Sequence, residues 1–311
     1  MTFIPREILD TIVNELQDDA ASLKGCSMSS WSLLIPARRS TFHHLRIKQG
    51  EVSYLWESKH FDRDHKRLLD LAELLENDPS LHPHREGTPT LSSCIRHLDL
   101  QLASAGSRRF RGKVVMAPQE KWHAMNSPLP VILDKLSPNH IEQVTLHFYG
   151  TSCPWRHLDP SMTSSILKLL RSPSIRTLDL SNIPGLPTNA VLHCPNLNDL
   201  RVGFMVDQGS ITDNAATKGL PFPIQHPPFE PSYPPPTPKY LTAASSSSFL
   251  AALTEVPDNV LAFNNLQHLS FIDAWTLSFH AESLVVKQAA QTLRYLHVSI
   301  NLNACIGVQF L

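Results

Sequence analysis

Residue clusters that could perform catalysis are few in this sequence. It contains no Gly-x-Ser-x-Gly turn for a serine nucleophile, no glycine-rich phosphate loop, no His-Glu-x-x-His motif and no paired Cys/His spacing typical of zinc. The pairs His43-His44 and His82-Pro83-His84 come nearest to a metal site, but each lacks a third ligand at a fixed local spacing. We therefore expect a protein that is not an enzyme, with no metal and no cofactor, and interpret these histidines as exposed.

Basic residues do not form a surface for nucleic acid either. The chain has 27 Lys and Arg against 28 Asp and Glu, a formal net charge of −1, so its average surface offers no strong field to phosphates. The run "SRRFRGK" at 107–113 carries one aromatic residue among the cations and has the composition of an RNA contact or a nuclear signal. Because it is short and isolated, we interpret it as a solvated loop and expect no nucleic-acid partner.

The first element that could position a binding site is an amphipathic helix within "FIPREILDTIVNELQDD", residues 3–19. Pro5 suits the first helical position because its missing N–H would have no partner there, and Glu7 lies near the positive end of the helix dipole. At 100° per residue the aliphatic side chains fall on one arc. These side chains are Ile8, Leu9, Ile12, Val13 and Leu16.

Two more short helices are predicted after it. Asp18 and Asp19 are suitable N-caps for a second helix that carries Leu23 and Cys26, and Pro36 begins a third stretch with Phe42 and Leu45 on one side. Three such helices make a core below the size that usually folds without a metal, disulfides or a partner. Part of the apolar surface is therefore expected to bind another protein.

This segment resembles an F-box of the fungal type. The resemblance rests on the Ile-Pro pair with an acidic residue two positions on, the aliphatic helix, the Leu-x-x-Cys-Ser segment and the Pro-Ala-Arg-Arg turn, and it covers residues 3 to about 46. It implies docking onto a Skp-type adaptor and, through it, onto a cullin scaffold. The residues at matching positions, which the resemblance assigns to the adaptor contact, are Ile4, Pro5, Ile8, Leu9, Ile12, Leu23 and Cys26.

A second pattern recurs beyond residue 90. Six segments have the form Φ-x-x-Φ-x-Φ, where Φ is aliphatic or aromatic, and begin at residues 95, 141, 175, 197, 266 and 293. Several copies follow a helical segment and a break, as "SSILKLL" precedes the copy at 175. Helix, break and short strand form the unit of a solenoid with parallel strands. The predicted fold class is therefore α/β, a curved solenoid of short parallel strands and helices. The segment "GKVVM" at 112–116 is interpreted as a degraded strand of one further repeat. This half resembles the irregular leucine-rich-repeat proteins often joined to F-boxes.

Within each predicted strand the aliphatic residues point into the core, and the alternating residues face outward on a concave sheet. The outward residues are polar, mixed in charge and rich in histidine, which suits a protein ligand better than a phosphate backbone. We expect them to bind a protein substrate. The candidates are His97, Asp99, Thr145, His147, Asp179, Arg201, His268, Tyr295 and His297.

The domain organisation follows from these patterns. Residues 1–46 are assigned to the F-box-like domain, 47–90 to a helical linker and 91–311 to the repeats. The repeats contain a Pro/Ser-rich insertion at about 208–250, with nine prolines from Pro221 to Pro238.

No secretory leader and no run of about 18 apolar residues is present, so we expect a cytoplasmic or nuclear protein without membrane contact. The five scattered cysteines are expected to be reduced and mostly buried.

Both halves together predict a non-catalytic substrate receptor of a cullin-type (SCF-like) ubiquitin ligase. One alternative is a protein-interaction scaffold without ligase function, whose N-terminal helices cap the solenoid as terminal repeats require. An enzyme or an RNA-binding protein on an irregular α/β fold is the least favoured interpretation. The two leading hypotheses differ in whether Ile8 and Leu9 face solvent.

Overall fold

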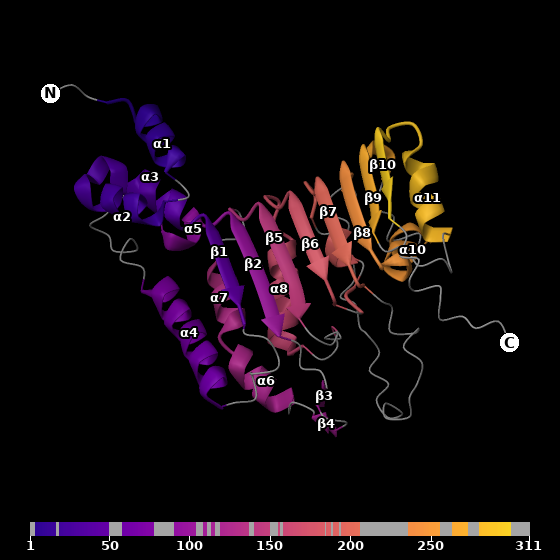
Figure 1. The fold of residues 1–311 in the computed structure, drawn as a ribbon, viewed down its shortest axis with the longest axis horizontal. Coiled ribbons are helices and arrows are strands. Elements are labelled where there is room, and N and C mark those ends of the chain that lie inside the picture. The colour runs from indigo at the N-terminus through magenta and orange to yellow at the C-terminus, as the bar shows by residue number, and fades with distance from the viewer. Residues whose placement is uncertain are drawn as a thin grey trace.

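The computed structural model of the chain is shown in Figure 1. It describes residues 4–16, 19–49, 58–77, 90–103, 108–110, 113–115, 119–136, 140–149, 155, 158–183, 185–187, 189–192, 194–205, 236–255, 263–272 and 280–299.

The central element is an eight-stranded sheet in which every neighbouring pair of strands is parallel. The strands lie side by side in the order in which they occur along the chain (Figure 1). They are β1 (His44–Lys48), β2 (His97–Ala103), β5 (Gln143–Tyr149), β6 (Thr177–Ser181), β7 (Asp199–Gly203), β8 (Tyr240–Ala244), β9 (His268–Ile272) and β10 (Tyr295–Val298). The chain is therefore of the mixed α/β class, as predicted.

Helices connect the strands and form a second layer behind the sheet, where Figure 1 shows α7 and α8. Contacts between α4, α6, α7 and α8, and between α10 and α11, continue this layer toward both ends. The helices that follow β1 are α4 (Ser58–Glu76), α5 (Leu91–Cys94), α6 (Gln119–Asn126), α7 (Leu129–Lys135), α8 (Pro160–Leu170), α9 (Asn189–Leu192), α10 (Ser247–Glu255) and α11 (His280–Ala289), with a 3-10 turn at Phe263–Asn265.

The main core lies between the sheet and this helical layer. In β6, Leu178 and Leu180 are fully buried while the alternating residues are half-buried, as the two-residue period of a strand requires. The buried side of α8, which includes Met162 and Ile166, packs in the same cluster. Complete burial of each such side chain contributes about 1.5–3 kcal/mol, so the apolar pattern sets which face of every strand meets the helices.

The N-terminal helices are α1 (Arg6–Glu15), α2 (Ala20–Ser29) and α3 (Trp31–Thr41), and Figure 1 shows them beyond β1. Asp19 caps α2, as predicted, by accepting hydrogen bonds from the backbone N–H groups of Ala21 and Ser22. These helices bury their own small cluster, Val13, Leu23 and Ala37, which is separate from the main core. A core of this size gives little stability by itself.

The third helix begins five residues earlier than the sequence suggested. Ser30 accepts a hydrogen bond from the N–H of Ser32 and so starts α3 at Trp31, which leaves Pro36 inside the helix and not at its first position. The segment around Leu45, expected as helix, is strand β1. The domain boundary proposed at residue 46 therefore falls inside β1, and the first strand of the sheet follows directly from the N-terminal helices.

The Pro/Ser-rich insertion is shorter than the predicted range of 208–250. Its described part, from residue 236 onward, contains β8 and the start of α10, and β8 pairs with both β7 and β9. The strand was missed because the repeat pattern here falls on Pro238, two residues before β8, and on Leu241 and Ala243 within it. All three are buried, but Pro and Ala do not match the pattern of larger aliphatic residues. The "GKVVM" segment, predicted as a degraded repeat strand, does contain a strand, β4 (Lys113–Val115), but this strand pairs antiparallel with β3 (Arg108–Phe110) and does not belong to the main sheet.

The predicted linker at 47–90 contains α4, whose Leu68, Ala72 and Leu75 join the main core. In the part of the chain that the structure describes, no helix combines the length and the apolar character needed to cross a membrane.

Candidate functional site

The first candidate surface is a row of isoleucines along α1 and the residues just before it. Ile4, Ile8 and Ile12 are 52%, 51% and 47% exposed. Ile8 and Ile12 are four residues apart and so lie one above the other on α1, while Ile4 precedes the helix by two residues. The Pro5 carbonyl accepts hydrogen bonds from the N–H groups of Ile8 and Leu9. The helix begins at Arg6, one residue later than predicted, so Pro5 is its N-cap and not its first helical residue. We call Ile4, Ile8 and Ile12 the apolar stripe.

The other residues assigned to the adaptor contact lie at different depths. Pro5 is exposed, whereas Leu9 and Cys26 are half-buried. Leu23 is 2% exposed in the three-helix cluster, so its side chain supports the helices and cannot contact a partner. Two further apolar side chains of this region, Met28 on α2 and Phe42 after α3, are exposed as well, and neither was among the predicted contact residues.

The second candidate surface is the face of the sheet opposite the helical layer, which we call the open face. The strand register aligns its side chains in rows across the strands. One row contains His44, His97, Gln143, Thr177, Asp199, Tyr240, His268 and Tyr295. The next contains Arg46, Asp99, Thr145, Asp179, Arg201, Thr242, Ser270 and His297.

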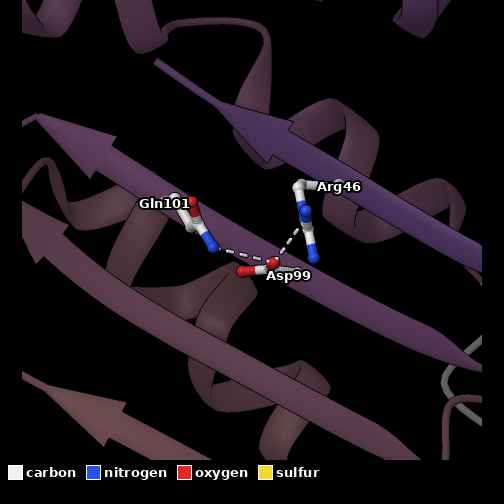
Figure 2. A network of polar contacts seen from close by, with 3 residues as sticks. All are labelled: Arg46, Asp99 and Gln101. Atoms are coloured by element: carbon white, nitrogen blue, oxygen red, sulfur yellow. Dashed lines mark hydrogen bonds and ion pairs between the residues drawn. The ribbon is translucent and has the colours of Figure 1, made fainter. Parts of the chain in front are cut away.

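Asp99 is the most enclosed charged residue of the open face among those described. It is 7% exposed, and its Oδ2 atom accepts hydrogen bonds from Arg46 Nε at 2.7 Å and from Gln101 Nε2 at 2.9 Å. Figure 2 shows both donors directed at this one oxygen, with the other carboxylate oxygen turned away from Arg46. That second oxygen, Oδ1, is buried and has no hydrogen-bond partner among the described residues. A buried carboxylate oxygen without a donor is costly.

Asp179 lies two strands from Asp99 in the same row, with Thr145 between them. Burial raises the pKa of Asp179, and Arg201 and His147 oppose this effect only in part. Within the described part of the chain, Asp179 has no hydrogen bond or ion pair, because Arg201 donates to Asp199 at 2.7 Å instead. Burial also lowers the pKa of His147, although both Asp179 and Asp99 favour its charged form. Asp99 and Asp179 thus form an acidic pair on either side of Thr145.

Toward the other end of the open face, three rings stand in neighbouring strands. Tyr240 and His268 are stacked, with ring centroids 4.8 Å apart and planes 20° apart, and Tyr295 follows with its centroid 5.9 Å from His268. We call these residues the ring stack. With Asp199 and Arg201 they line a depression of about 340 Å³.

A group of histidines occupies the β1 end of the open face. The His43 ring lies 4.7 Å from the His97 ring, and His44 lies within 6.2 Å of both. Burial is the main cause that lowers the pKa of His44 and of His97, and the neighbouring carboxylates of Asp99 and Glu142 oppose the effect only in part. Among the described residues, no group of three His, Cys, Asp or Glu side chains is arranged to hold a metal ion.

All nine residues assigned to substrate binding lie on the open face. They are spread along it from β2 to β10, and the register brings together only subsets of them. His97 lies with the other histidines at the β1 end, and His268 lies beside Tyr295. The central subset is Asp99, Thr145, His147 and Asp179, and His297 lies within 3.0 Å of the Ser270 hydroxyl. Sequence reasoning missed Arg46 and Tyr240. For Arg46 a signal was present, because "FHHLRI" at 42–47 fits the repeated pattern.

Scanned against protein-family models and against curated proteins, the chain matches none.

Proposed function

We propose that this chain is the substrate-receptor subunit of a cullin-based ubiquitin ligase. Helices α1–α3 bind a Skp-type adaptor, and the open face binds the protein substrate. The chain makes and breaks no bonds in this role. It raises the effective concentration of substrate lysines near a ubiquitin-loaded enzyme held elsewhere in the assembly.

The observation that carries the proposal is the apolar stripe. Three isoleucines are each about half exposed: Ile8 and Ile12 lie on α1, which packs against α3, and Ile4 lies just before this helix. Covering the exposed halves would contribute about 1 kcal/mol for each side chain, since complete burial of an isoleucine is worth about 1.5–3 kcal/mol. The three-helix cluster beneath is small, so a partner that covers the stripe would also stabilise these helices.

The charge of the open face supports a protein ligand over a nucleic acid. In its described part, Arg46, Lys48 and Arg201 are matched by Asp99, Asp179 and Asp199, and two of the guanidinium groups already bind carboxylates. A surface that follows a phosphate backbone would present an excess of Lys and Arg. Polar residues with aromatic rings among them are typical of protein interfaces.

The test is co-purification of the full chain with a Skp-type adaptor. The variant Ile4→Asp plus Ile8→Asp should lose the association, because the charges would be buried without partners. Leu69→Asp plus Leu74→Asp is the matched control, since both leucines are about half exposed on α4, outside the three N-terminal helices. This control should bind the adaptor as the natural chain does. A folded natural chain that does not retain the adaptor would refute the ligase function.

One observation favours the alternative of an interaction scaffold. Helix α3 contacts α5 and leads directly into the edge strand β1, so the N-terminal helices occupy the position that a cap of the sheet would take. A cap would leave the stripe without a partner. If the open face binds a protein while no adaptor associates with α1–α3, the scaffold function is the correct one.

A further inference from the structure

The centre of the open face offers a binding site for a positive charge. Across β2, β5 and β6 the row reads Asp99, Thr145 and Asp179, so two carboxylates flank a small hydroxyl side chain. Adjacent strands are about 4.8 Å apart, which places the α-carbons of the two aspartates roughly 10 Å from each other. An ammonium or guanidinium group above Thr145 would lie between both carboxylates.

In the described part of the chain the counter-charge of this acidic pair is incomplete: Arg46 binds the Oδ2 atom of Asp99, and no cation binds Asp179. Asp99 is more than nine-tenths buried, and its Oδ1 atom has no donor among the described residues. Asp179 has no hydrogen bond or ion pair within the same described part, because the nearest guanidinium, that of Arg201, is held by Asp199. The numbers of cations and carboxylates on this face are equal, but Arg46 and Arg201 bind Asp99 and Asp199, and Lys48 on β1 forms no ion pair with a described residue. Asp179 is therefore the carboxylate that a cation from a ligand would pair with.

The ring stack offers a ligand a second contact, at a defined distance from the acidic pair. Tyr240 stacks on His268 with one face of its ring, so its other face is turned toward β7, where Asp199 and Arg201 line the depression. A flat ring inserted there would stack on Tyr240 and contact the Arg201 guanidinium. From β5 to β8 there are three strand spacings, or about 14 Å, and an extended peptide covers that distance in about four residues at roughly 3.3 Å each.

We propose that the open face binds an extended peptide segment that places a Lys or Arg side chain over Thr145, between Asp99 and Asp179, and an aromatic side chain about four positions away against Tyr240. This inference rests on the proposed role of the open face as the substrate-binding surface, and it names the class of substrate. The peptide crosses the strands, so its backbone does not extend the sheet and specificity comes from the two anchoring side chains.

The experiment is selection of random dodecapeptides displayed on phage, with the immobilised full chain as the target. The selected peptides are expected to share a basic residue and an aromatic residue about four positions apart, in either order. The same selection on Asp179→Asn should lose the preference for the basic residue, and on Tyr240→Ala it should lose the preference for the aromatic one. Because Asp179 is only half-buried and Tyr240 is exposed, both variants are expected to fold.

Affinities of a selected peptide then test each contact separately. Replacing the peptide's basic residue by Gln, or Asp179 by Asn, should weaken binding about tenfold, as expected for loss of a charge-assisted contact. Tyr240→Ala should weaken it about threefold to tenfold. Asp134→Asn is the matched control: it removes a carboxylate on α7, where Asp134 binds Lys168 at 2.9 Å in the helical layer, and should leave the affinity unchanged.

The outcomes separate this inference from the proposed function. Peptides that lose binding on Thr242→Arg, which blocks the open face, but share no basic residue would overturn the inference and leave the receptor function standing. Failure to select any peptide that needs the open face would overturn it too. Adaptor binding is measured independently, and Ile4→Asp plus Ile8→Asp should not change peptide affinity.

Discussion

The ionised side chain of Asp179 destabilises the folded state. Burial raises its pKa, so the folded state holds the carboxyl proton more tightly than the unfolded chain does. The stability contributed by the protonated form is present below the ordinary pKa of Asp and is lost as the pH rises through the higher pKa of the folded state. At neutral pH the ionised carboxylate is therefore unfavourable, as expected for a group placed for binding and not for folding.

We predict that Asp179→Asn raises the free energy of unfolding at pH 7, by an amount on the order of 0.5 kcal/mol, as for other partly buried polar substitutions. The gain should shrink as the pH falls through the raised pKa of Asp179, because the carboxyl group of the natural chain then becomes protonated and resembles the amide. Urea unfolding at pH 7 and pH 4 measures both values. A variant that is less stable than the natural chain at pH 7 would contradict this account.

The cysteine side chains differ in how deeply they are buried. Cys94 and Cys194 are buried and Cys26 is half-buried, in agreement with the expectation of mostly buried thiols, while Cys153 and Cys305 lie outside the described residues. Burial raises the pKa of Cys194 to about 12, and its Sγ donates to the Leu170 carbonyl. Cys194 is therefore a packing residue between α8 and β7 and has no thiolate chemistry near neutral pH.

At the scale of elements, helix α8 behind the sheet begins at a side-chain cap, Asp159. Asp159 accepts hydrogen bonds from the N–H and the hydroxyl of Ser161 at the start of α8, and Pro160 follows as the first helical residue. These bonds lower the pKa of Asp159, with the Ser161 hydroxyl as the largest cause. The cap thus contributes stability above the ordinary pKa of Asp.

Asp159→Ala is predicted to lower the free energy of unfolding at pH 7 by about 1 kcal/mol, the usual cost of removing such a cap. The contribution should disappear as the pH falls through the lowered pKa, because the protonated carboxyl is a weaker acceptor. Asp159→Asn is the control, since asparagine caps helices about equally well. Thermal unfolding followed by circular dichroism compares the three chains, and equal stability of the Ala and Asn variants would be inconsistent with the cap.

At the scale of the whole molecule, the chain contains two unequal cores. The sheet and its helices form one continuous cluster, whereas Val13, Leu23 and Ala37 form the small separate cluster of α1–α3. The free energy of local opening follows the amount of apolar contact, so the N-terminal helices should open more often than the central strands.

Hydrogen exchange followed by mass spectrometry should therefore show exchange at least about tenfold faster in α1–α3 than in β5 and β6, corresponding to a difference in opening free energy of about 1.4 kcal/mol or more. A partner that covers the apolar stripe should slow the exchange of the helices and leave that of the strands unchanged. Equal protection of the two parts in the isolated chain would show that they unfold as one unit.

The sequence alone determined the local parts of this description. The aliphatic residues of α1, the cap at Asp19 and the six repeated strands were all predicted, because helix and strand periodicity and capping depend on residues a few positions apart. The start of α3, strand β1 and strand β8 were not. Pro36 was interpreted as a helix start, and the copy "FHHLRI" was interpreted as part of a helix. In the copy that contains β8, Pro238 and Ala243 occupy positions where the pattern expects larger aliphatic residues.

Only the tertiary structure decided which outward-facing residues meet. Arg46 binds Asp99 across 53 positions of sequence, and Asp99, Thr145, Asp179 and Arg201 align in one row although the connections between their strands differ in length. Lateral position in a parallel sheet is set by the hydrogen-bond register and by burial of the facing leucines, neither of which can be read from the spacing of the copies. For the same reason the acidic pair and the ring stack, and the distance between them, became visible only in the folded chain.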